Sequence, residues 1–134
     1  MKGVAFVGAQ SKRQTEVAGH FARHYDKVKT VCIVDRKLEA AKQLADRFGA
    51  IPTSDLGSVA KDSSVNLVCL DVPYEERLQA IQISAESGKD ILCFGPIEPS
   101  LEDTKIAVGF AKKGGVRLFA PFLPRNNPHL SSTK

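Results

Sequence analysis

Short, continuous apolar runs alternate along the chain with longer segments in which apolar residues recur every three or four positions. Continuous apolar runs are typical of strands that are covered on both faces, and the longer spacing is typical of amphipathic helices. The runs predict strands at residues 3–8, 28–34, 50–53, 65–70, 90–94 and 116–122. The spaced segments predict helices at residues 11–26, 37–48, 55–61, 74–87 and 100–113.

This alternation predicts an α/β fold, namely a doubly wound parallel sheet of about six strands in a single domain with right-handed crossovers. Gly49 and Gly88 follow two of the helical segments, where a C-terminal cap is expected. We expect the domain to cover residues 1–122. Residues 123–134 hold two prolines and two asparagines, and we expect them to form a tail or a truncated linker.

Composition excludes several classes of protein. Hydrophobic residues make up 43% of the 134 residues and charged residues 25%, the balance of an ordinary globular domain. No apolar run approaches the roughly 20 residues of a membrane span, and the start does not resemble a secretory signal. The three cysteines form no Cys-x-x-Cys motif, so we expect buried reduced thiols and a cytoplasmic protein. The net charge of +4 is spread along the chain, which argues against nucleic-acid binding.

In doubly wound sheets, ligands bind beyond the carboxyl ends of the strands, so the loops after Val7, Val34, Leu70 and Phe94 are candidates. The first loop follows a strand and opens a helix, which is the context of a dinucleotide-binding turn. Of the usual three glycines it keeps only Gly8. It is either a tight turn that needs one glycine, or a phosphate site at a helix N-terminus.

The second loop places Asp35 directly after a strand. A carboxylate there can accept both ribose hydroxyls of an adenosine and would repel a 2′-phosphate. The alternative is a residue that ends the strand as a turn or caps the next helix. Arg36 could stack on adenine. Arg36, Lys37 and Lys12 leave NADP possible, whereas Asp35 favours NAD.

Several segments together resemble the N-terminal domain of the glucose–fructose oxidoreductase/inositol dehydrogenase/MocA family of NAD(P)-dependent oxidoreductases, which has a Rossmann-like fold. The similarity covers about residues 3–128. The matching segments are VAFVGA at 4–9, VDR at 34–36, residues 40–50, VNLVCL at 65–70 with Pro73, GKDILC at 88–93, Pro96, and Arg125 with Pro128. The loops and the resemblance together predict cofactor-binding residues, namely Gly8, Ala9, Gln10, Ser11, Lys12, Arg13, Asp35, Arg36, Asp71, Val72, Pro73, Tyr74, Gly95 and Pro96.

The resemblance also shows where this chain differs from the family. The family has Cys-Glu-Lys-Pro after the fifth strand, with the lysine near the nicotinamide, whereas this chain has Gly95 at the lysine position. Arg77 stands where the family commonly has a histidine, and the family's second, substrate-binding domain has no counterpart in 134 residues. Tyr74 either contacts the nicotinamide or begins the apolar stripe of its helix. We therefore predict no catalytic residue and no catalysis by this chain alone.

Three functions are compatible with this sequence. The first is an NAD(P)-binding domain of an oxidoreductase-family protein, either a fragment of a longer enzyme or, as the altered lysine motif favours, a complete one-domain relative. The second is a non-catalytic scaffold for protein–protein association, including self-association. The third is an enzyme half completed by a partner chain. His20 and His24 lie one helical turn apart, but no carboxylate completes a metal site, so we predict none.

Overall fold

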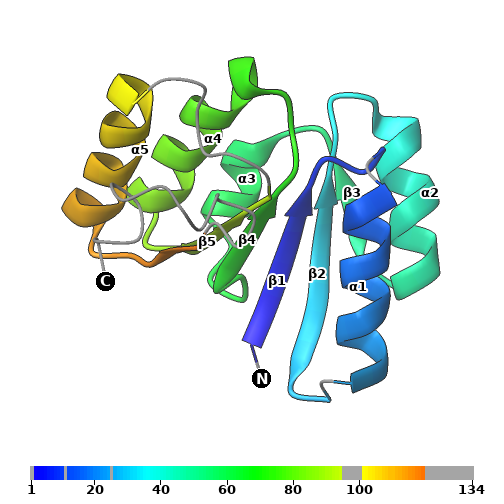
Figure 1. Ribbon diagram of the computed structural model, residues 1–134. Helices are drawn as coiled ribbons and strands as arrows, with labels where there is room; N and C mark the ends of the chain where they lie inside the picture. Colours follow the sequence, from blue (N-terminus) through cyan, green and yellow to red (C-terminus); the bar gives the residue numbers. More distant parts are fainter. Residues whose placement is uncertain (1, 11, 25, 95–100, 120–134) are drawn as a thin grey trace.

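The computed structural model describes residues 2–10, 12–24, 26–94 and 101–119. Within these residues strands and helices alternate, as Figure 1 shows. They are β1 (Lys2–Val7), α1 (Lys12–His24), β2 (Val28–Val34), α2 (Leu38–Phe48), β3 (Ile51–Thr53), α3 (Leu56–Ala60), β4 (Leu67–Leu70), α4 (Tyr74–Glu86), β5 (Asp90–Cys93), α5 (Leu101–Gly114) and β6 (Leu118–Phe119). The strands form one parallel sheet in the order β3-β2-β1-β4-β5-β6. The predicted doubly wound fold is confirmed.

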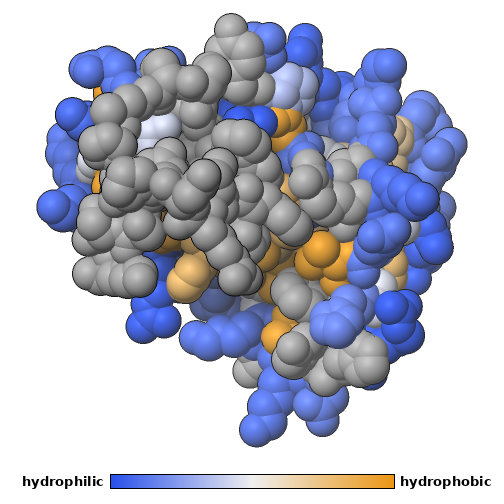
Figure 2. Space-filling model, viewed as in Figure 1, coloured by the Kyte–Doolittle hydropathy of each residue, from blue (hydrophilic) through white to orange (hydrophobic). Residues whose placement is uncertain are grey.

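Helices lie on both faces of the sheet and divide the core into two clusters. One cluster joins α1 and α2 to strand residues such as Phe6 and Ile33, both fully buried. The other joins α3, α4 and α5 to residues such as Leu70 and Ile91, also fully buried. Figure 1 shows α1 and α2 together on one side and α4 and α5 together on the other. In Figure 2 hydrophilic side chains dominate the outer parts of the view, and apolar atoms of the described residues are visible nearer its middle.

The strand order reverses between β1 and β4, because the chain adds β2 and β3 on one side of β1 and then crosses to the other side. Val7 at the end of β1 is in register with Val34 of β2 and with Leu70 of β4. The loops that follow these strands therefore leave the sheet side by side, and a crevice opens between them.

One observed boundary differs from the predicted one at a place where a side chain replaces a backbone hydrogen-bond acceptor. The fourth strand begins at Leu67 rather than at residue 65. The Oδ1 atom of Asn66 accepts a hydrogen bond from the Gly3 backbone N–H at 2.9 Å, so a side chain takes the place of a carbonyl there. Gly49 and Gly88 have the positive φ angles expected of helix C-caps, 64° and 75°. The predicted tail at residues 123–134 lies outside the described residues.

No helix among the described residues has both the length and the apolar character that a bilayer span requires.

Candidate functional site

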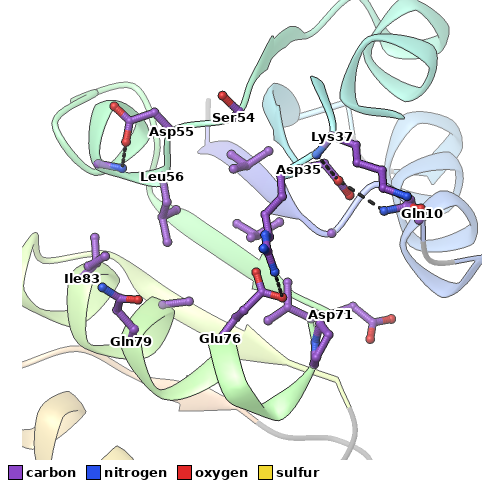
Figure 3. A pocket seen from close by; sticks show the side chains of 18 residues that line it. Gln10, Asp35, Lys37, Ser54, Asp55, Leu56, Asp71, Glu76, Gln79 and Ile83 are labelled. Carbon is purple, nitrogen blue, oxygen red and sulfur yellow. Dashed lines mark hydrogen bonds and ion pairs between the residues drawn. The ribbon is translucent and has the colours of Figure 1, made fainter. Parts of the chain in front are cut away.

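A cavity of about 1080 Å³ lies at the carboxyl ends of the strands on the β3-β2-β1-β4 side of the sheet. Figure 3 shows the side chains around it, which come from the loops after β1, β2, β3 and β4, from the start of α3 and from α4. The cavity is lined by Val7, Gly8, Gln10, Val34, Asp35, Arg36, Lys37, Ser54, Asp55, Leu56, Gly57, Asp71, Val72, Pro73, Glu76, Gln79, Ala80 and Ile83. A cavity of this volume can hold a ligand as large as a nucleotide.

Gly8 makes the turn that forms one edge of the cavity. Its N–H donates to the Val34 carbonyl at 2.8 Å, which ties the turn to the end of β2. Its φ is 107°, a conformation that side chains rarely adopt, and a Cβ atom would collide with the carbonyl oxygen of Asp71. Only glycine therefore fits where the loops after β1 and β4 approach each other. The prediction that this turn needs Gly8 is confirmed.

Asp35 lies on the floor of the cavity and is 7% exposed. Its Oδ2 accepts the Ala9 backbone N–H at 2.8 Å, and its Oδ1 accepts the Lys37 backbone N–H at the same distance. The carboxylate thus holds the loop after β1 against the loop after β2. The alternative that Asp35 ends the strand as a turn residue is confirmed by its hydrogen bond with Lys37, whereas a cap of the next helix is wrong, because the N-cap of α2 is Lys37. The turn does not exclude a ligand, because the same carboxylate lines the cavity.

Gln10 stands where the dinucleotide-binding fingerprint has its second glycine. Its side chain lies at the rim of the cavity, and its Nε2 donates to Asp35 Oδ1 at 3.3 Å (Figure 3). Because the cavity stays open beside it, the glutamine narrows the approach to Asp35 without filling the crevice.

An ion pair joins two sides of the cavity. Arg36, from the loop after β2, has its Nη1 atom 3.6 Å from Oε2 of Glu76, on the first turn of α4 (Figure 3). The arginine side chain is 82% exposed, so the pair is solvated and weak. Glu76 also belongs to the first turn of α4, where an acidic side chain suits the positive end of the helix dipole.

Three groups of residues were missed, namely Gln14, the residues between β3 and the start of α3, and the α4 residues that line the cavity, Glu76, Gln79, Ala80 and Ile83. Gln14 is fully buried, and its Nε2 donates to the carbonyls of Val7 at 2.8 Å and Cys69 at 2.9 Å, which joins α1 to the ends of β1 and β4. The loop after β3 supplies Ser54 and Asp55 to the cavity, and the start of α3 supplies Leu56. A signal existed for the second group: β3 pairs with β2, so its carboxyl end reaches the same edge.

The structure brings about half of the predicted residues to the cavity. Those that line it are Gly8, Gln10, Asp35, Arg36, Asp71, Val72 and Pro73. Ala9 takes part through its backbone N–H, whereas Lys12 is exposed on α1 and does not line the cavity. The side chains of Arg13 and Tyr74, and the residues Ser11, Gly95 and Pro96, lie outside what the structure describes.

The remaining candidates supply no further chemistry. No group of three or more metal-ligating side chains occurs among the described residues. Cys32, Cys69 and Cys93 are buried and form no disulfide. Burial raises the pKa of the Cys69 thiol to about 12, so it is neutral near pH 7 and is not a nucleophile.

The cavity therefore combines the glycine turn at Gly8, where no side chain covers the backbone, the buried carboxylate of Asp35, and apolar walls. A carboxylate accepts hydrogen bonds from hydroxyls, and an apolar wall suits a planar base. Val34, Leu56 and Ile83 contribute to that wall. These features are of the kind that bind a nucleoside.

Comparisons with known proteins agree with this geometry. The profile of the GFO/IDH/MocA family, an oxidoreductase family with an NAD-binding Rossmann fold, matches residues 2–122. An NAD⁺-dependent scyllo-inositol 2-dehydrogenase of Bacillus subtilis (strain 168) is 31% identical over 107 residues, which are 79% of this chain and 31% of that enzyme. The chain spans only 24% to 31% of the length of the curated relatives that it matches.

Solved structures give the same result. GenD2 from gentamicin A biosynthesis, in complex with NAD, superposes with a TM-score of 0.83 at 25% identity, over 89% of this chain and 34% of that one. KijD10, a 3-ketoreductase from Actinomadura kijaniata in complex with TDP-benzene and NADP, has the same fold, with a TM-score of 0.80 at 18% identity over 98% of this chain and 42% of that one. The chain belongs to the GFO/IDH/MocA family of oxidoreductases and forms an NAD-binding Rossmann domain of that family.

Proposed function

We propose that the cavity between Gly8 and Asp35 binds the adenosine diphosphate half of a nicotinamide dinucleotide. The observation that carries this proposal is the buried Asp35 carboxylate at the end of β2, next to the Gly8 turn and open to a cavity of about 1080 Å³. The ribose hydroxyls would donate to Asp35, the base would lie against Val34 and Leu56, and the pyrophosphate would pass the bare backbone of Gly8.

We further infer that NAD is preferred to NADP. A 2′-phosphate would lie next to the Asp35 carboxylate and be repelled by it. Arg36 is the nearest candidate to compensate, but its guanidinium pairs with Glu76. This weak pair offsets part of the positive charge of Arg36, so Arg36 compensates only in part for the repulsion by Asp35.

The reaction of the family supports a role for this chain in binding rather than in complete turnover. When bound, the nicotinamide ring exchanges a hydride with the substrate, which requires a substrate held against it and a group that exchanges a proton. Gly95, at the family's lysine position, has no side chain for that exchange. The chain also spans about a third of the length of its solved relatives. We propose that substrate is positioned by residues other than those described.

Fluorescence titration tests both parts of the proposal. The chain has no tryptophan, so the emission of NADH can be followed with little interference. NADH emission should rise saturably at micromolar protein, and NADPH should bind about ten-fold more weakly or worse. Asp35→Ala should weaken NADH binding. Its control is Asp46→Ala, which removes an exposed carboxylate of α2 away from the cavity and should bind NADH like the wild type. Flat titrations with both dinucleotides would reject the proposal, and equal affinities would reject the preference.

A further inference from the structure

Asp35 has fewer open acceptor positions than a ribose requires. An ionised carboxylate offers about four acceptor positions, two on each oxygen. Among the described residues, Oδ1 accepts from Lys37 N–H at 2.8 Å and from Gln10 Nε2 at 3.3 Å, while Oδ2 accepts from Ala9 N–H at 2.8 Å. Both acceptor positions of Oδ1 are therefore occupied, and one acceptor position of Oδ2 remains open.

An adenosine ribose presents two neighbouring hydroxyls, at its 2′ and 3′ carbons. If both donate to the same carboxylate, they need two acceptor positions. The two backbone donors cannot leave without opening the loops after β1 and β2, since their hydrogen bonds hold these loops together. Gln10 is different, because its side chain is exposed and its hydrogen bond is long.

We propose that the Gln10 side chain competes with the ribose diol for Asp35 Oδ1, so that dinucleotide binding requires Gln10 to move away. The inference rests on the proposed function of the cavity. It makes Gln10 a positioning residue that lowers the affinity for ligands with both hydroxyls and leaves the affinity for ligands with one hydroxyl unchanged. The glycine of the usual fingerprint would leave Oδ1 open.

Calorimetric titration of the full chain with ADP and with 2′-deoxy-ADP tests this competition. Gln10→Ala removes the side chain, and Gln10→Met keeps its length but cannot donate a hydrogen bond. In both variants ADP should bind about two- to five-fold more tightly than to the wild type, the factor expected for one weak hydrogen bond. The affinity for 2′-deoxy-ADP should stay the same. Thermal melts should match the wild type, because Gln10 is exposed.

The outcomes separate this inference from the proposal on which it rests. If the wild type binds neither ADP nor NADH at millimolar concentration, the proposed function fails and the competition fails with it. If the wild type binds ADP but both ligands change equally in the variants, only the role of Gln10 is wrong. Weaker ADP binding in the variants would likewise overturn the competition, since it would show that Gln10 assists the ligand.

Discussion

Replacing Asp35 by alanine removes the acceptor of three hydrogen bonds and separates the structural role of this residue from its binding role. The Ala9 and Lys37 backbone N–H groups each lose a charged partner at 2.8 Å. Such bonds contribute about 1.5–3 kcal/mol each when buried, but water from the open cavity can replace part of the loss. We expect the free energy of unfolding to fall by about 2 kcal/mol, and Tm by roughly 6–10 °C.

The effect on binding should be larger than the effect on stability. Two ribose hydroxyls that donate to the carboxylate at about 1.5 kcal/mol each amount to about 3 kcal/mol, or roughly a 100-fold loss of NADH affinity. NADH fluorescence at a temperature where the variant is folded measures this loss, with Asp46→Ala as the control. A variant that melts lower but binds NADH as the wild type does would refute the reasoning, because Asp35 would then only join two loops.

Three further substitutions or modifications test other parts of the site. In Glu76→Gln, Arg36 loses its carboxylate partner, so NADPH should bind about three-fold more tightly while the affinity for NADH changes little. Titrations in which the affinities for NADPH and NADH change equally would contradict this role of Glu76. Gly8→Ala should lower the free energy of unfolding by about 2 kcal/mol or more in urea melts, because of the positive φ and the collision with Asp71; an unchanged midpoint would show that the turn adapts. Cys69 should resist Ellman's reagent at pH 8 in the native protein and react once urea unfolds it, since burial raises its pKa to about 12.

The sequence predicts the parts of the site that depend on topology. Once residues 3–8 and 28–34 are identified as apolar parallel strands, their carboxyl ends must meet at one edge, which brings Gly8 next to Asp35. The sequence also predicts the requirement for glycine at position 8, because the chain must make a tight turn there between a strand and a helix. These predictions needed no side-chain geometry.

Other features depend on how helices rotate and how far side chains reach, which periodicity does not determine. Gln14 looks like any polar residue of an amphipathic helix, yet it is fully buried against two strand carbonyls. In the sequence, Glu76 is only an acidic residue at the start of a helix. Its ion-pair partner, Arg36, is 40 positions earlier, so periodicity does not predict the pair. The hydrogen bond from Gln10 to Asp35 likewise depends on a rotamer.

The central claim is that a nicotinamide dinucleotide binds between the Gly8 turn and Asp35, and ¹⁵N–¹H correlation spectra recorded during an NADH titration test it most directly. The backbone amides of Gly8, Ala9 and Lys37 lie at this crevice, so their signals should shift in a saturable way and further than those of α5. ADP alone should reproduce most of these shifts. Shifts that cluster on α5, or none at millimolar NADH, would contradict the account.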